Sequence, residues 1–119
     1  MTEIKDSGER EEFPTGAVRD TRENKGRYDL LPWSAIHQVA IQCQLGANKY
    51  GERNINKGMP ISRLMDSATR HISQYLEGQD DEDHLRAAAW NILWAIWMRE
   101  EKPEMQDIPT RLEDEDGCY

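Results

Sequence analysis

The residues with the clearest capacity for chemistry lie between Glu77 and His84. Five of the seven residues from 77 to 83 are carboxylates, and a histidine follows them directly. An acid in the first turn of a helix caps free N–H groups and complements the helix dipole, which explains any one of these carboxylates. A run of them repels itself unless a cation offsets the charge. We therefore expect a cation here, with Glu77, Asp81 and His84 as catalytic residues.

Two further polar residues belong to the segments that flank this run. His71 lies beside the apolar stripe of the preceding segment, and Asn91 lies two helical turns after His84, on the same face. A short turn makes the two segments pack antiparallel. One groove would then be lined by the metal ligands that we expect: His71, Glu77, Asp81, Asp83, His84 and Asn91. Such ligands suit Mg²⁺ or Mn²⁺, with other divalent metals possible. A buried Asn91 bonded to backbone is the simpler alternative.

Basic residues in the middle of the chain suit a phosphate group. From 49 to 70 bases outnumber acids, the reverse of the balance elsewhere. Lys49, Arg53 and Arg70 could hold the phosphate tail of a nucleotide, and Trp33 or Tyr50 could stack on its base. A carboxylate would accept the proton of the attacking water. A solvated loop with no ligand would have the same composition.

Three amphipathic segments must position these residues, and we predict an all-α domain over 33–99. Proline precedes the first two helices, which are expected at about 33–49 and 61–76, each with an apolar stripe at helical spacing. The third is expected at about 81–99 because acids favour a helix start. Cys43 falls at an apolar position of the first helix and is expected in the core.

The two ends of the chain lack sustained periodicity. Residues 1–32 combine dense charge with glycine and proline, so we expect an extended N-terminal arm. Lys25 and Arg27 flank a glycine in this arm, and they are either functional cations or solvated charges on a strap. Residues 100–119 contain Pro103, Pro109 and an acidic end, and we expect an acidic flexible tail.

The third helix is apolar nearly all round from Leu85 to Met98. A helix of this kind has to be covered on all sides, and two other helices can hardly do so. We therefore expect the bundle to be completed by homo-oligomerisation, as a homodimer or homotetramer.

Composition limits the classes of function. A net charge of -8 argues against a general nucleic-acid binder, so no stable nucleic-acid partner is expected. The N-terminus has no apolar signal segment, and the longest apolar run, 87–98, is too short to span a bilayer. We expect no membrane association and a cytoplasmic location, in the host cell if the protein is phage-encoded. A small acidic interaction protein that mimics DNA, without catalytic activity, is the alternative.

Four segments together carry a resemblance to a known family. KGRYDLLPWSAI, GANKYGERNINKGMP, LMDSATRHISQYLEG and DEDHLRAAAWNILW follow one another in this order. The chain resembles, over roughly Gly16 to Trp97, the phage dATP/dGTP diphosphohydrolases (MazZ), which are MazG-like helical enzymes. The resemblance implies a MazG-like bundle and metal-dependent hydrolysis of a purine deoxynucleoside triphosphate to monophosphate and pyrophosphate. In phages that replace adenine by 2-aminoadenine, the dGMP product of the family feeds synthesis of the modified nucleotide.

The resemblance also implies roles for individual residues. The family's motif positions in this chain are Lys25, Gly26, Arg27, Asp29, Lys49, Tyr50, Gly51, Arg53, Asn54, Asp66, Arg70, His71, Glu77, Asp81, His84 and Asn91. Among them, the substrate-binding residues would be Lys25, Arg27, Lys49, Arg53, Asn54, Asp66 and Arg70.

One departure from the MazG pattern affects the metal site. MazG proteins carry ExxE on one helix and ExxD on the next, at facing positions. His71 and Gln74 occupy the first pair of positions in this chain, and Ala88 and Asn91 occupy the second. The four-carboxylate cage is therefore not present as such. Either the acids of 77–83 replace it, or imidazole and amide ligands do.

Overall fold

The structure is a computed structural model that describes residue 4, residue 6 and residues 8–112. The chain divides into two compact units, Met1–Pro32 and Trp33–Tyr119. In the described part, no helix is both long and apolar enough to cross a membrane.

The N-terminal unit contains a short antiparallel hairpin that the sequence analysis did not predict. Strands β1 (Arg10–Glu12) and β2 (Val18–Asp20) pair with Arg10 opposite Asp20. The turn between them is closed by the Phe13 N–H, which donates to the Ala17 carbonyl at 2.9 Å. Strands of three residues are too short to display an alternating apolar pattern, so this pairing leaves little trace in the sequence. The chain is therefore mostly helical rather than all-α.

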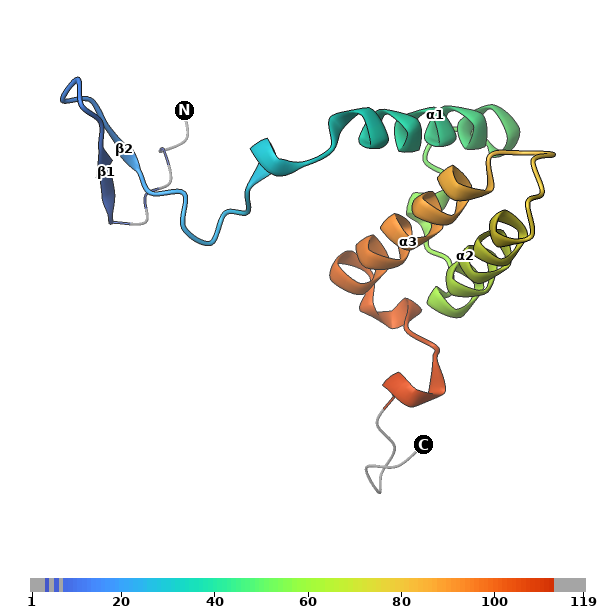
Figure 1. Ribbon diagram of the computed structural model, residues 1–119. Helices are drawn as coiled ribbons and strands as arrows, with labels where there is room; N and C mark the ends of the chain where they lie inside the picture. The colour runs from blue at the N-terminus through green and yellow to red at the C-terminus, as the bar shows by residue number, and fades with distance from the viewer. Residues whose placement is uncertain (1–3, 5, 7, 113–119) are drawn as a thin grey trace. The chain divides into compact units, whose positions relative to one another are not determined.

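The second unit contains three helices, which confirms the helical prediction for this part of the chain. They are α1 (Trp33–Tyr50), α2 (Ile61–Leu76) and α3 (His84–Glu101). A short 3-10 turn, Ile55–Lys57, lies in the connection between α1 and α2. Figure 1 shows α2 and α3 side by side, with α1 near the N-terminal end of α3. Arg86 on α3 links the two by donating from Nε to Gln42 Oε1 on α1 at 2.9 Å.

The core lies between α2 and α3. Ile61 and Leu64 of α2 pack with Ala95 and Met98 of α3, and all four side chains are buried. Three tryptophans of α3 pack against this cluster from its edge. None of the α1 side chains is fully buried. The expectation that Cys43 belongs to the core is wrong: its side chain is exposed, because α2 and α3 bury their apolar stripes against each other rather than against α1.

Helix α3 begins at His84 rather than at Asp81. Asp83 is its N-cap, and Oδ1 of this residue accepts a hydrogen bond from the Arg86 backbone N–H at 3.0 Å. The cap satisfies one of the free N–H groups in the first turn. Asp81 and Glu82 consequently belong to the loop between α2 and α3, where their side chains can fold back toward both helices.

The segment after α3 packs against the helices. Two 3-10 turns, Pro103–Met105 and Pro109–Arg111, follow α3, and Met105 and Ile108 contact the core cluster. The Asp107 carboxylate accepts hydrogen bonds from the Ser62 backbone N–H at 2.8 Å and from the Ser62 hydroxyl at 2.5 Å. These bonds lower the pKa of Asp107 below its ordinary value. The expected flexible tail over 100–119 thus does not describe residues 103–111, and 113–119 lie outside the described residues.

Candidate functional site

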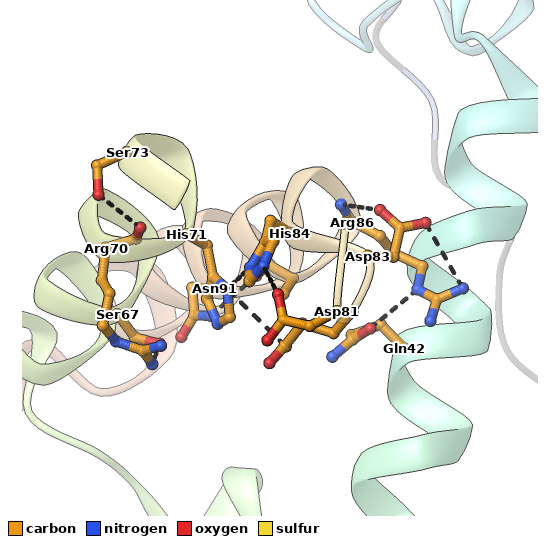
Figure 2. A network of polar contacts seen from close by, with 12 residues as sticks. Gln42, Ser67, Arg70, His71, Ser73, Asp81, Asp83, His84, Arg86 and Asn91 are labelled. Carbon is orange, nitrogen blue, oxygen red and sulfur yellow. Dashed lines mark hydrogen bonds and ion pairs between the residues drawn. The ribbon is translucent and has the colours of Figure 1, made fainter. Parts of the chain in front are cut away.

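Two buried histidines meet where α2 and α3 approach the turn that joins them. His71 follows Leu64 and Ala68 on the buried stripe of α2, and His84 is the first residue of α3. Their side chains are almost completely enclosed, with relative exposures of 6% and 2%. The two Nδ1 atoms are 2.9 Å apart, and Figure 2 shows the rings turned toward one another.

Asp81 fixes the orientation of the second histidine. Its Oδ1 lies 2.7 Å from Nε2 of His84, and this hydrogen bond lowers the pKa of Asp81. A carboxylate accepts only from a protonated nitrogen, so Nε2 of His84 carries the hydrogen, and its Nδ1 lone pair accepts the hydrogen bond that His71 Nδ1–H donates at 2.9 Å. A carboxylate on the remote nitrogen of a histidine is the usual support for a metal-ligating imidazole. Asp81 therefore acts on the site through His84.

Glu82 completes a group of three donors. Its Oε1 lies 3.9 Å from Nδ1 of His71, and the ligand atoms of His71, Glu82 and His84 all lie within 4.8 Å of one another. With bonds of about 2.1 Å, two ligands at a right angle on one metal stand about 3.0 Å apart. The two Nδ1 atoms are already this close because they share a hydrogen bond, and a cation would take the place of the proton between them. These three donors could hold a divalent cation if they drew closer together, and two imidazoles with one carboxylate suit Mn²⁺ or a later transition metal better than Mg²⁺.

The environment of His71 favours the form that can bind metal. Burial lowers the pKa of His71, and the nearby Arg70 guanidinium lowers it further, against a smaller opposing effect of Glu82. The imidazole is therefore neutral at neutral pH. A metal requires a neutral ring, because protonation occupies the lone pair that would bind it.

Acidification through the pH range in which an unperturbed histidine takes up a proton is expected to destabilise the metal-free protein. Because the pKa of His71 lies below its ordinary value of 6.5, the unfolded chain takes up this proton more readily than the folded one. The contribution of neutral His71 to stability is complete above the unfolded-state pKa, and it declines as the pH falls from there toward the folded-state pKa. Urea titrations between about pH 5 and pH 8 measure the slope. His71→Gln should flatten it, and an unchanged slope would contradict this assignment.

The other expected ligands lie apart from the histidine pair. Glu77 is the C-cap residue of α2, and its Oε2 accepts a hydrogen bond from Gln79 Nε2 at 3.2 Å. Asp83 caps α3 and faces Arg86 (Figure 2). Asn91 is buried and donates from Nδ2 to the Ala87 carbonyl at 2.8 Å, which is the backbone-bonded alternative. The roles of these three residues as metal ligands stay predictions without support from the geometry.

Glu82 was not among the expected ligands, although it belongs to the acidic run. The signal that could have found it is Asp83, the acid directly before the apolar segment and hence the best N-cap. Because the helix starts at His84, Asp81 and Glu82 both fall in the loop, where their side chains can approach the histidines.

A cleft of about 1190 Å³ opens beside the histidine pair. It is bounded by the C-terminal half of α1, the α1–α2 connection, α2 and α3, and His71 and Asn91 line its wall. Three arginines also line it: Arg53, Arg63 and Arg70. None of these three has an ion pair with another described residue, so their charges are available to an anionic ligand. Arg63 is an addition to the expected phosphate-binding set.

The expected binding residues of the connection and of α2 also line this cleft. They are Tyr50, Asn54 and Asp66, and the indoles of Trp90 and Trp94 form part of the same wall. Arg53 adopts a left-handed backbone conformation, with φ of 63°, which is uncommon for a residue other than glycine.

A smaller cavity of about 320 Å³ adjoins this cleft at His71. Its lining includes Lys49, Arg70, His71 and Glu82. The Lys49 ammonium is held near the ring of Tyr50, with Nζ 5.1 Å from the ring centroid. Lys49 therefore reaches the site through this cavity.

Three expected substrate contacts lie elsewhere. Trp33 is 57% exposed at the start of α1 and lines neither cavity. Lys25 and Arg27 belong to the N-terminal unit, where Lys25 pairs with Asp20 at 2.9 Å and Arg27 with Asp29 at 2.8 Å. The Arg27 guanidinium lowers the pKa of Asp29 to about 2. The substrate-binding roles of these three residues stay predictions.

Comparison with known proteins agrees with the resemblance noted in the sequence. A protein of Salmonella phage PMBT28 named dATP/dGTP diphosphohydrolase is 27% identical over an alignment of 90 residues, and the match covers 71% of this chain. The match spans only 31% of the length of that relative. No solved structure matches the chain, so the likeness to a MazG bundle stays a prediction. A family model described as dATP/dGTP diphosphohydrolase, N-terminal, matches residues 15–108, and the chain therefore belongs to this family.

Proposed function

We propose that the chain carries the catalytic site of a metal-dependent hydrolase that converts dGTP and dATP to the monophosphate and pyrophosphate. The observation that carries this proposal is a His71–Glu82–His84 donor group beside a cleft lined by three arginines that form no ion pair within the described part of the chain. Membership of the dATP/dGTP diphosphohydrolase N-terminal family supports the substrate class. The dGMP released would be available for synthesis of 2-aminoadenine nucleotides.

The chemistry divides between a cation and the side chains of the chain. A divalent metal held by Nδ1 of both histidines and by Glu82 would activate water and neutralise charge on the phosphoryl oxygens. Asp81 keeps His84 in the tautomer that offers Nδ1. Glu52 or Asp66, which line the larger cleft, would accept the proton from water.

The arginines would bind and orient the substrate. A guanidinium binds phosphate oxygens with two N–H donors in a fixed fork, which fixes the direction of the phosphate chain. Water oxygen then bonds to the α-phosphorus, and the α–β bridging oxygen departs with pyrophosphate. Orientation of this kind contributes to rate because the reacting atoms are already in line.

The convergence of acids on a buried centre distinguishes this proposal from a DNA mimic. Asp81 and Glu82 both approach the two enclosed imidazoles. A mimic needs its carboxylates spread over a convex surface at phosphate-like spacing, whereas a metal site needs them to converge. The catalytic proposal is therefore favoured.

Turnover of each dNTP with Mn²⁺ or Mg²⁺ tests the proposal. We expect dGTP and dATP to give monophosphate and pyrophosphate, measured by ion-exchange chromatography. Glu82→Gln should reduce the rate far more than Glu77→Gln, because Glu82 belongs to the donor group with the two histidines and Glu77 does not. Equal reductions of the rate in both variants would show that Glu77 also contributes to the site. Absence of turnover of any nucleotide with either metal would overturn the proposed activity.

We also propose that the chain forms a homodimer or homotetramer. Apolar side chains repeat at helical spacing on the outer faces of α2 and α3, and they are exposed: Met65, Ile72, Leu76, Leu85, Ile92, Leu93 and Ile96. Two antiparallel helices with a second apolar face can complete a four-helix bundle with the same pair from another copy.

Sedimentation or light scattering measures the oligomeric state. We expect the wild-type chain to have twice or four times the 13.9 kDa mass of one chain. Leu93→Glu should shift it to the monomer, because a charge in an apolar interface has no partner there. Ile36→Glu on α1 is the matched control. A wild-type monomer at micromolar concentration would exclude this arrangement.

A further inference from the structure

The two cavities overlap at His71 and share five of the eight residues that line the smaller one. Gln42, Gly46, Tyr50, Arg70 and His71 belong to both. The smaller cavity adds Lys49 and Glu82, while the larger adds two arginines, two indoles and several amides. The smaller cavity is thus a charged extension of the larger, mixed cleft.

We propose that the smaller cavity binds the pyrophosphate portion of the substrate and that the larger cleft binds the nucleoside with its α-phosphate. This inference rests on the proposed function. It assigns Lys49 to the leaving group and Arg63 to the nucleotide that remains. Arg70 serves both because it lines both compartments.

The lining of the smaller cavity suits a compact anion. Lys49 and Arg70 supply two positive charges, and the single carboxylate, Glu82, is one of the three donors that could hold a cation. An ammonium acts as a point charge toward phosphate oxygens. A volume of about 320 Å³ is at the lower limit for an organic ligand pocket. A base and sugar would also find little apolar surface in it.

The larger cleft contains the features that a nucleoside requires. Trp90 and Trp94 offer aromatic surface, and Asn54 and Asp66 offer hydrogen-bonding groups. The indole N–H groups of both tryptophans are buried and have no hydrogen-bond partner among the described residues. A buried donor without a partner is costly. A ligand that carries acceptor atoms, such as a purine with its ring nitrogens, could supply the missing partner.

The division places the scissile bond where the two cavities overlap. The α-phosphorus would lie beside His71, which lines both, with the β- and γ-phosphates on the Lys49 side. When water oxygen bonds to the α-phosphorus, the α–β bond breaks across this boundary. The monophosphate remains in the larger cleft, and pyrophosphate leaves from the smaller cavity.

Equilibrium dialysis of the two products tests the division without turnover. Radiolabelled pyrophosphate and dGMP are each measured against the full chain at fixed free Mn²⁺. Lys49→Gln should weaken pyrophosphate binding by about tenfold or more, since it removes a charge-assisted contact, and should change dGMP binding less than about twofold. Arg63→Gln should show the opposite pattern. Lys57→Gln and Arg99→Gln are matched controls, since neither residue lines a cavity.

The outcomes separate this inference from the proposed function. Reversed effects of the Lys49 and Arg63 variants, or equal effects of both on both ligands, would overturn the division while leaving the hydrolase intact. Wild-type binding of neither product would overturn both. A pattern as expected in a chain that hydrolyses no dNTP would support the two subsites and contradict the catalytic proposal.

Discussion

Replacement of His84 by alanine is expected to abolish turnover and to reduce Mn²⁺ affinity by more than about 100-fold. Loss of a residue that merely supports a metal ligand already costs about 10–100-fold, and His84 is itself a donor of the three-residue group. It is also the residue through which Asp81 acts. Its removal therefore eliminates one ligand and the support of that ligand together. Isothermal titration with Mn²⁺ and a dGTP turnover assay measure the two losses.

The controls separate loss of the site from loss of the fold. His84 is almost completely buried, so the alanine variant leaves a cavity and its melting temperature must be measured beside its activity. Asp81→Asn keeps the volume of the side chain and should lower Mn²⁺ affinity by about 10–100-fold. A folded His84→Ala protein with wild-type turnover would place the metal elsewhere.

Removal of divalent metal is expected to abolish turnover and to lower the melting temperature. A metal that binds only the folded chain stabilises it by about 2.7 kcal/mol at a concentration one hundred times its Kd. Treatment with EDTA followed by dialysis should remove this stabilisation, and Mn²⁺ should restore both stability and activity. Calorimetry and the turnover assay follow the two effects in the same samples.

The choice of metal and a matched variant make this prediction specific. Two of the three donors are imidazoles, so Mn²⁺ should restore the melting temperature at lower concentration than Mg²⁺. His71→Gln should respond weakly to both ions. An equal response of this variant and the wild type would show that the ion stabilises the chain from another site.

The helices were predictable because their signals are local. The stripe through Ile61, Leu64 and Ala68 repeats at helical spacing, and prolines and glycines mark the ends of α2. The start of α3 was less certain because four consecutive acids could each cap a helix, and only the geometry selects Asp83. The contribution of Met105 and Ile108 to the core depends on contacts distant in sequence, which no local pattern encodes.

The candidate site was predictable in part for the same reason. His71 and His84 were both expected to line one groove, but their contact depends on a connection, 77–83, that is longer than the short turn expected. Counting outward from that turn therefore places His71 opposite residues beyond His84. Glu82 reaches them only because the helix starts after it, so an error of a few residues in the boundary excluded it. Arg63 lines the cleft because the α1–α2 connection lies beside α2, and the spacing of residues in the sequence does not determine the position of that connection.

The left-handed backbone of Arg53 has a consequence for how this chain would respond to selection. Such a conformation costs a residue with a side chain of the order of 1 kcal/mol, and glycine avoids that cost. Selection for heat resistance alone would therefore favour glycine here, and the same exchange would remove a cation from the cleft. An arginine at this position is what we would expect if the residue had been selected for anion binding rather than for thermal stability.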